Sequence, residues 1–443
     1  MNYEQIKNVV LVVLVCTSIM LTLSIWNYKP NLETIEDDYI HEVSIGETRE
    51  AVDLIKPTKL LFHDEDQHFG TTNEKEIDSV MEELQGWTFN EPKNISNALN
   101  EKEFEQLVYG MNKMELVFPT FIPFYTMNTI WSFKSREVPN AVFDRIVINR
   151  MHIKDKKTSV YFISTNERLV FESEVSSPTL STFKKNYLNQ SREWDIYVSK
   201  KLDENRQLFL PEGVPSLMRY KYYPDDIDTV KFKDALFTDP GIVKKGTKTD
   251  GEEYTDGSSL MRVSTKDKMI LYVNPAKEME TGRGGSLHGL IDKSINFVNE
   301  HSGWTDQYRL FEAVPGSPQI SYRLFINGQP VFNQEGMAEI VQIWGKEQIY
   351  KYVRPYFTLN ISIPSEADEV ELQDGLTAFN QVKQQPGFDV EMLEDMTVGY
   401  QLRHDVQTDK ILVLEPAWFY KYDGSWKELL WDEEMGGNIH GLE

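Results

Sequence analysis

Residues 8–26 read NVVLVVLVCTSIMLTLSIW and contain no charged side chain, although charged residues make up 26% of the chain. The apolar run extends to Tyr28, and a helix of about 20 residues, at ~1.5 Å of rise per residue, spans a hydrocarbon core of ~30 Å. A single span must satisfy its backbone polar groups internally, so even a valine-rich segment is expected to be helical in lipid. We therefore predict one transmembrane helix over residues 8–28, preceded by a short tail of residues 1–7.

A cleavable secretion signal is the alternative interpretation of this run. Such signals have a shorter apolar core and small residues at the cleavage site, which Leu21 to Trp26 does not provide. Lipoprotein processing is disfavoured as well, since Val15 precedes Cys16 where a small residue is expected. We predict a retained, single-pass anchor in the cell membrane. Because an amino-terminal apolar segment usually exports the chain after it, we expect a cytoplasmic tail and an extracytoplasmic chain beyond Lys29.

Ser18 and Thr22 lie four residues apart and would share one face of this helix. That small-xxx-small spacing lets two membrane helices approach closely, so the pair is a candidate site for membrane-helix packing. In the alternative interpretation, the hydroxyl groups bond back to carbonyl oxygens of their own helix. The spacing alone leaves both interpretations open.

The charge balance narrows the range of partners. The chain has 443 residues, with 46 lysines and arginines against 70 aspartates and glutamates, a formal net charge of -24. Phosphate backbones would be repelled, so nucleic-acid binding is not expected. Cys16 is the single cysteine and lies in the apolar run, which leaves the rest of the chain without a disulfide, a metal–thiolate site or a thiol nucleophile.

Residues 29–200 predict an α+β domain in which helices alternate with strands. Asparagines at positions 73 and 100 are each followed three residues later by a glutamate, which is typical of the start of a helix. Strands are expected between residues 142 and 173. The apolar positions at helical spacing are Ile77, Val80, Met81 and Leu84 in the first helix and Phe104, Leu107, Val108 and Met111 in the second.

Beyond residue 200 the same order of elements occurs twice. Each unit has an amphipathic helix followed by strands, and Asn327-Gly328 indicates a hairpin in the first of them. The expected helical faces are Leu287, Leu290, Ile291, Ile295 and Val298 in the first unit and Leu372, Leu376, Phe379 and Val382 in the second. We predict two domains, 201–358 and 359–443, each a helix on an antiparallel sheet, which completes a three-domain α+β ectodomain.

Common catalytic motifs of zinc proteases, serine hydrolases and P-loop enzymes do not occur in the sequence. HDEDQH at His63–His68 gathers metal-ligand residue types, but its spacing favours a solvated loop. GRGGSLHG at Gly282–Gly289 precedes a helix and could cradle a phosphate, yet it lacks the P-loop lysine and is interpreted as a connection. DGEEYTDG at Asp250–Gly257 resembles a calcium loop only in its acidity.

Ser181 to Lys184 forms an S-x-x-K, the nucleophile motif of penicillin-recognising enzymes. Ser294 and His301 begin sequences that echo the other two motifs of those enzymes. The echoes are too close together to line opposite walls of an active site, and Ser294 falls inside a predicted helix. We interpret the match as chance, and we predict no catalytic, cofactor-binding or metal site.

Four segments of the second half occur in a characteristic order: YTDGSSLMRV, ILYVNP, SYRLFINGQPVF and LEPAWFYKYDGSW. With the single anchor and the acidic, cysteine-free remainder, they resemble the YycH family of Gram-positive bacteria over essentially the whole chain. The resemblance implies a membrane-anchored accessory protein of the YycG/YycF (WalK/WalR) two-component system, which controls cell-wall metabolism. It also implies a three-domain ectodomain whose last two domains resemble the partner protein YycI.

The resemblance implies no catalytic residues and a mode of action by contact with YycI and the sensor histidine kinase YycG, through the membrane helix and the ectodomain. We therefore expect a non-enzymatic regulator without a cofactor. An extracytoplasmic module that binds or senses cell-wall fragments is the alternative, and it would need a concave pocket lined by aromatic side chains. A wall-modifying hydrolase that uses Ser181 is a third hypothesis.

Overall fold

The computed structural model divides the chain into two compact units, residues 1–43 and 44–443. The structure describes helical residues 8, 11, 14, 15 and 17–22 of the first unit, and residues 44–65, 67–135, 137–150, 157–277, 285–363 and 368–431 of the second. Among these residues, no helix is long and apolar enough to cross a membrane. Part of the predicted span 8–28 lies outside the described residues.

The first sheet contains 11 strands from the described part of residues 59–211. In spatial order these are β11 (Gln207–Pro211), β10 (Asp195–Lys201), β2 (His68–Thr71), β1 (Lys59–His63), β5 (Lys113–Pro123), β7 (Val142–Asn149), β8 (Lys157–Ser164), β9 (Leu169–Ser176), β3 (Thr88–Phe89) and β6 (Ser132–Phe133), with β4 (Lys93–Asn94) paired to β9. The antiparallel β10–β11 hairpin carries this sheet past residue 200, where the sequence places a domain boundary.

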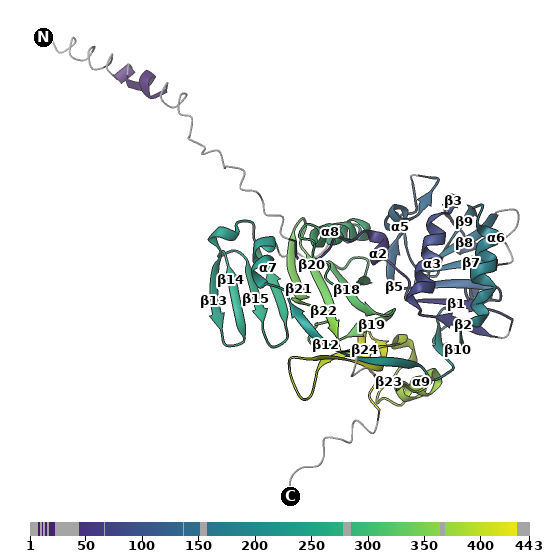
Figure 1. Ribbon diagram of the computed structural model, residues 1–443. Helices are drawn as coiled ribbons and strands as arrows, with labels where there is room; N and C mark the ends of the chain where they lie inside the picture. Colours follow the sequence, from purple (N-terminus) through teal and green to yellow (C-terminus); the bar gives the residue numbers. More distant parts are fainter. Residues whose placement is uncertain are drawn as a thin grey trace, which may run out of the picture. The chain divides into compact units, whose positions relative to one another are not determined.

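Helices pack against both faces of the first sheet, and α3 (Glu74–Gln85) and α6 (Leu180–Phe183) are labelled beside its strands in Figure 1. Apolar residues of α3 and α6 join Leu60 of β1 in one core cluster. The next residue, Leu61, belongs to a second cluster with residues of α4 (Glu101–Tyr109), because successive side chains of a strand point to opposite faces. Strand β1 is therefore buried on both faces, which explains why its sequence does not alternate.

Asparagine caps begin both helices that the sequence predicts in this region. Asn73 accepts hydrogen bonds from two amides of the first turn of α3, and Asn100 forms a complete capping box with Glu103 at α4. The apolar face predicted for the second helix was too long by one position. Helix α4 ends at Tyr109, so Met111 lies in the following turn and is 54% exposed.

The second sheet contains 15 strands among the described residues. In spatial order these are β13 (Lys244–Lys248), β14 (Gly251–Thr255), β15 (Leu260–Ser264), β16 (Met269–Val273), β21 (Ile349–Pro355), β20 (Glu339–Trp344), β18 (Gln319–Ile326), β19 (Gln329–Phe332), β24 (Leu393–His404), β25 (Leu412–Tyr422), β12 (Ser216–Asp226) and β22 (Phe357–Ser362). Three further strands pair along its length: β17 (Tyr308–Ala313) with β18, β23 (Asp368–Glu371) with β12, and β26 (Ser425–Glu428) with β25.

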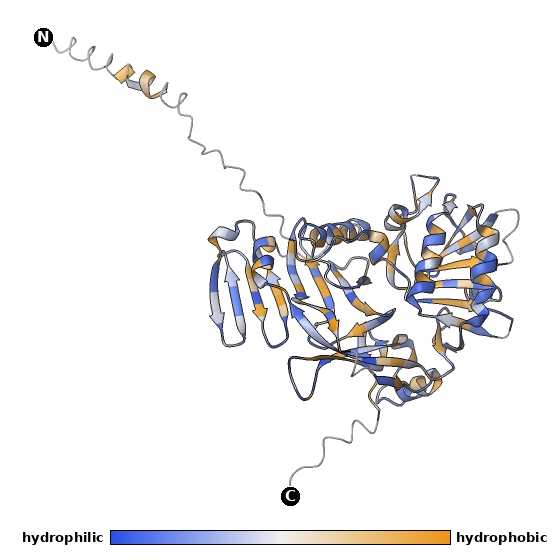
Figure 2. Ribbon diagram, viewed as in Figure 1, coloured by the Kyte–Doolittle hydropathy of each residue, from blue (hydrophilic) through white to orange (hydrophobic). Residues whose placement is uncertain are grey.

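Hydropathy varies along this sheet (Figure 2). Strands β18, β20 and β21 carry hydrophobic residues, whereas edge strand β13 is hydrophilic and exposed throughout. Its sequence, KKGTK, places lysines on an edge whose outer side has no partner strand among the described residues. Charged edges of this kind discourage pairing with a further strand.

The two predicted helix-on-sheet units share one continuous ladder. The pairs within each unit are antiparallel, as in the β18–β20 and β24–β25 pairs, whereas β19 of the first unit and β24 of the second pair in parallel, with Val331 opposite Tyr400. Strand β12, which the sequence assigns to the middle domain, pairs with β25 and β23 of the last one. Hydrogen bonding therefore continues across residue 358, and the boundary placed there stays a prediction.

Each unit has its amphipathic helix. In α8 (Leu287–Asn299) the buried face includes Ile291, Ile295 and Val298, as predicted. In α9 (Gly375–Lys383) the buried apolar residues are Ala378, Phe379 and Val382. The prediction for the second helix began too early, because Leu372 precedes α9 and Leu376 is 40% exposed.

The predicted Asn327-Gly328 turn joins β18 to β19 and also contacts the first sheet. Both residues have positive φ, 51° and 81°, which the twist of a tight hairpin requires. A Cβ added to Gly328 would lie 2.4 Å from the backbone oxygen of Thr72, next to the start of α3. Gln329 donates to the Thr72 hydroxyl at 2.7 Å, so the hairpin is a contact between the two sheets.

We expect Gly328→Ala to destabilise the protein by about 2–3 kcal/mol, because it adds a clash with Thr72 to the ~1 kcal/mol penalty of a left-handed conformation. Gly257→Ala is the matched control, since Gly257 also has positive φ, 92°, but no atom lies within 4 Å of its added Cβ. Urea unfolding followed by tryptophan fluorescence measures both variants. Equal destabilisation would contradict the contact between the hairpin and Thr72.

Candidate functional site

The larger unit begins with an extended segment, residues 44–49, which we call the amino-terminal strap. Its backbone pairs with residues 301–304, which come after α8. The amide of Ile45 donates to the carbonyl of His301 at 3.1 Å, and Glu47 and Trp304 exchange two hydrogen bonds of 2.9 and 3.1 Å. The strap thus adds a short antiparallel bridge to the part of the chain that forms the second sheet.

Asn299, at the end of α8, holds the strap by a reciprocal pair of hydrogen bonds. Its Oδ1 accepts from the Arg49 amide at 2.9 Å, and its Nδ2 donates to the Arg49 carbonyl at 2.9 Å. The indole of Trp304 donates to the same Oδ1 at 2.8 Å, which fixes the orientation of the amide. The Arg49 guanidinium donates to Gln307 at 2.9 Å. Each such bond contributes about 1 kcal/mol net.

Gly46 lets the strap lie this close to its partner. A Cβ at this position would meet the carbonyl oxygen of Trp304 at 2.5 Å, and that oxygen is an acceptor in the bridge. Any side chain would push the two backbones apart, which is a typical reason for glycine where two backbones approach closely. Gly46 is also the one sequence signal that could have indicated the strap.

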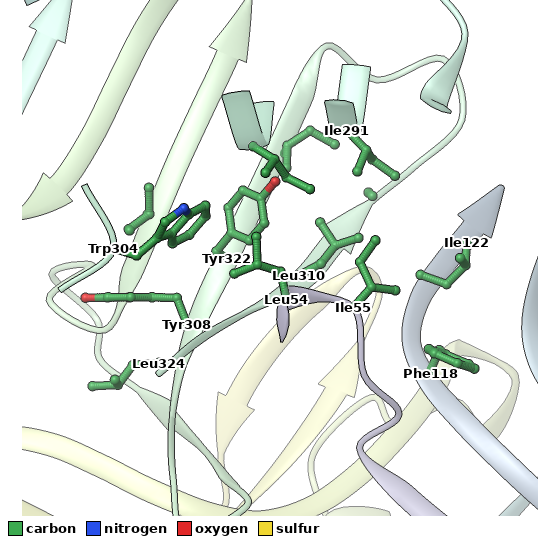
Figure 3. Close-up of a cluster of buried hydrophobic side chains, with 14 of the residues drawn as sticks. Leu54, Ile55, Phe118, Ile122, Ile291, Trp304, Tyr308, Leu310, Tyr322 and Leu324 are labelled. Carbon is green, nitrogen blue, oxygen red and sulfur yellow. The ribbon is translucent and has the colours of Figure 1, made fainter. Parts of the chain in front are cut away.

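Two apolar residues anchor the chain directly after the strap. The short helix α2 (Ala51–Leu54) ends with Leu54 and is followed by Ile55, which are 0% and 1% exposed. Figure 3 shows both side chains beside Trp304 of the loop after α8 and Tyr322 of β18, with Phe118 and Ile122 of β5 on the other side. Burying side chains of this size stabilises by ~1.5–3 kcal/mol each.

Three ionisable residues, the buried Arg354 and His301 and the partly buried Asp306, lie in or against the loop that pairs with the strap. Arg354 of β21 is 0% exposed and donates to the carbonyl of Gly303 at 2.6 Å and to the Thr305 hydroxyl at 3.1 Å. Burial, and then the Arg354 guanidinium, lower the pKa of His301 to about 3, so this imidazole is neutral at pH 7. Burial raises the pKa of Asp306 to about 6, against hydrogen bonds and positive charges that favour its carboxylate. Hydrogen bonds from the buried Arg354 therefore hold the loop, residues 301–306, that pairs with the strap.

Ser18 and Thr22, the predicted packing pair, are both exposed in the helical part of the first unit. The Thr22 hydroxyl donates to the carbonyl of Ser18 at 2.9 Å, as in the intrahelical interpretation. Such a bond occupies the hydroxyl hydrogen and leaves the small side chains on that face of the helix. The packing role of the pair stays a prediction.

The HDEDQH sequence contributes to a buried cluster instead of a solvated loop. His63 is 0% exposed, and its Nε2 lies 3.1 Å from the Glu115 carboxylate while its Nδ1 lies 2.9 Å from Nδ1 of His68. Burial, and then His63, lower the pKa of His68 to about 4. Burial opposes the ionisation of Glu115, but Arg145 and His63 outweigh it and hold its pKa below the ordinary value.

The described residues contain no group of three or more His, Cys, Asp or Glu side chains placed to hold a metal ion. Asp66 of HDEDQH and residues 282–284 of GRGGSLHG lie outside the described residues. DGEEYTDG forms β14 and the turn after it. Ser181 is exposed on α6, whereas Ser294 is buried in α8 with its hydroxyl 2.7 Å from that of Tyr322.

These features define a two-sheet α+β protein whose amino-terminal strap is fixed to the part that forms the second sheet. Two family models match the chain: "YycH protein, N-terminal domain" over residues 4–191 and "YycH protein, C-terminal domain" over residues 205–434. The chain belongs to the YycH family, as its sequence segments indicated.

Two relatives are similar over nearly the whole chain. The "Two-component system WalR/WalK regulatory protein YycH" of Bacillus subtilis (strain 168) is 24% identical over 440 residues, 96% of each chain. The crystal structure of YycH from Bacillus subtilis superposes with a TM-score of 0.75 at 22% identity. That match covers 88% of this chain and 100% of the other, and it confirms the mixed helix-and-sheet fold.

We expect Gly46→Val to detach the strap, because the added side chain cannot fit against the Trp304 carbonyl. Hydrogen–deuterium exchange should then show the amides of residues 45–47 exchanging at least ~10-fold faster, which corresponds to a local loss of about 1.4 kcal/mol. Thr48→Val introduces the same side chain at an exposed strap position and should leave the exchange rates unchanged. Unchanged protection in Gly46→Val would rule out the bridge as described.

Proposed function

We propose that this chain is a non-enzymatic regulatory subunit of a two-component system that modulates a sensor histidine kinase controlling cell-wall metabolism. Membership of the YycH family carries the proposal, since a relative that aligns over 96% of this chain is a regulatory protein of the WalR/WalK system. The kinase partner is of the YycG/WalK type. A YycI-like protein is the second partner, reached through transmembrane and extracytoplasmic contacts.

The proposed topology follows from the uncharged run. Residues 8–28 anchor the protein in the cell membrane, with the amino terminus in the cytoplasm and the two sheets outside. The Ser18/Thr22 face is the proposed contact with a partner helix, because small side chains permit close approach. The Thr22–Ser18 hydrogen bond is compatible with this role, since it removes the hydroxyl's need for another partner within the membrane.

Regulation then acts by differential binding. A subunit shifts a kinase between two conformations only if it binds them with different affinities. The strap supports such a role because the chain at the start of the larger unit is held by paired backbone bonds and by buried Leu54. In the proposed mechanism, any coupling between the anchor and the larger unit passes through this held segment.

A catalytic role has less support. The Ser181 hydroxyl of the S-x-x-K sequence is exposed on the short helix α6. Ser294, which begins the second echo, is 0% exposed and pairs with the buried Tyr322 hydroxyl, so it serves the packing of α8 on β18. The nearby His301 has a buried ring beneath the strap, and its carbonyl accepts from Ile45.

We expect a crosslinked membrane pull-down of the intact protein to recover a histidine kinase, and the double variant Ser18→Ile/Thr22→Ile to reduce that recovery about 10-fold or more. Bulky side chains on this face would separate the helices and remove close packing. Met20→Leu, on the opposite face of the helix, is the control and should retain the kinase.

Replacement of residues 8–28 by an unrelated apolar helix tests the anchor as a whole. Loss of the kinase in this swap would support the membrane contact. Equal recovery in the swap and the intact protein would contradict a role for the anchor beyond tethering. Absence of any kinase from the intact protein would contradict the proposed function itself.

A further inference from the structure

A groove of about 390 Å³ lies on the last part of the second sheet, where β19, β24, β25 and β26 meet. Its volume falls within the ~300–1,000 Å³ that is usual for small-molecule sites. The lining includes Arg323, Phe332, Gln334, Gln401, Phe419 and Trp426. They come from both predicted helix-on-sheet units, whose strands β19 and β24 pair in parallel (Figure 1).

Aromatic rings form the base and one wall of the groove. Phe332 and Phe419 stack with ring centroids 4.0 Å apart, and both are buried. Trp426 packs with its centroid 5.2 Å from that of Phe332 but is only half-buried. Its indole N–H has no partner among the described residues, so Trp426 offers both a ring surface and a donor to a molecule in the groove.

Glutamine side chains provide unused hydrogen-bonding groups. The side-chain amides of Gln334, Gln385 and Gln401 make no hydrogen bond within the described part of the chain, and each has two N–H donors and a carbonyl acceptor. Asn333 differs, since its Nδ2 donates to the Leu402 carbonyl and its Oδ1 accepts from the Met337 amide, both at 2.9 Å. The side chain of Asn333 therefore holds neighbouring backbone, whereas the three glutamine side-chain amides can hydrogen-bond to a ligand.

Charges around the groove are balanced. Arg323 is 6% exposed, lies between the rings of Phe311 and Phe332 at 4.4 and 4.3 Å, and pairs with Glu339. Its Nε–H is buried without a partner among the described residues. Lys427 and Glu428 add one charge of each sign. A strongly charged ligand would find no net counter-charge here, and a wholly apolar one would leave the amides unsatisfied.

We propose that this groove binds an uncharged, hydroxyl-rich sugar, a pyranose disaccharide in which one ring stacks on Trp426. The C–H face of a flat pyranose ring packs on an indole, and its hydroxyl groups pair with the glutamine amides. Half-exposed aromatic rings beside unpaired amides match a ligand that has one apolar face and a polar edge. The inference is independent of the proposed regulatory function, because the groove lies far from the strap in the sequence and uses none of its residues.

Isothermal titration calorimetry of the full-length protein tests the proposal with two flat β-linked disaccharides, cellobiose and N,N′-diacetylchitobiose. Sorbitol is the control ligand, since it carries hydroxyl groups but has no ring face to stack. We expect saturable binding of at least one disaccharide and none of sorbitol. No saturable binding of either disaccharide, or equal binding of sorbitol, would overturn the proposal.

Two variants locate the site. Trp426→Ala should weaken disaccharide binding at least 10-fold, and Gln401→Leu, which keeps the size of the side chain, should weaken it about 3- to 10-fold. Tyr125→Ala removes a 40% exposed aromatic ring outside the groove and should bind as the unmodified protein does. Circular dichroism establishes that the variants are folded. Unchanged binding in both groove variants would place the sugar elsewhere and overturn the assignment.

Discussion

Burial of Leu54 and Ile55 where the two sheets meet is the interaction on which the rest of the structure depends. Their helix α2 lies against α5 (Phe124–Ile130), which comes after β5 of the first sheet, and against β17 of the second. The strap precedes them and pairs with the loop after α8, so hydrogen bonds and apolar burial fix the same short stretch of chain. Ordering residues 44–55 in this way costs conformational entropy. The burial of Leu54 and Ile55 and the paired backbone offset this cost.

The paired strap, residues 44–49, matters for the regulation by contact that we propose. Under the proposed topology, any coupling between the anchor and the two sheets passes through the strap, whose backbone is paired. Asn299 and Trp304 hold the strap, and Arg354 fixes the loop beneath them. The second sheet, and not the first, is therefore the part to which residues 44–49 are fixed. The hairpin at Gly328 and the Arg309–Glu74 ion pair then link it to the first sheet.

Local signals in the sequence predicted much of the fold, and non-local contacts limited the rest. Asparagine caps, amphipathic periods and Asn327-Gly328 all act within a few residues, and the structure confirms them except at the helix ends, where Met111, Leu372 and Leu376 lie off the buried faces. The sequence did not predict the strap, because backbone hydrogen bonds hold this extended segment and they leave no periodic pattern of apolar side chains. His63 was assigned to a solvated loop, since its partner Glu115 lies on β5 and the Arg145 that pairs with Glu115 lies on β7. The parallel β19–β24 pair and the sugar groove likewise arise only when distant strands meet.

Kinase autophosphorylation in proteoliposomes is the measurement that tests the coupling role of the strap most directly. The kinase would be reconstituted with the full-length protein, with Gly46→Val, or with the control Thr48→Val. We predict that the unmodified protein and Thr48→Val change the rate equally, whereas Gly46→Val, with its strap detached, returns it to that of the kinase alone. Full modulation by Gly46→Val would contradict the view that the strap couples the anchor to the ectodomain.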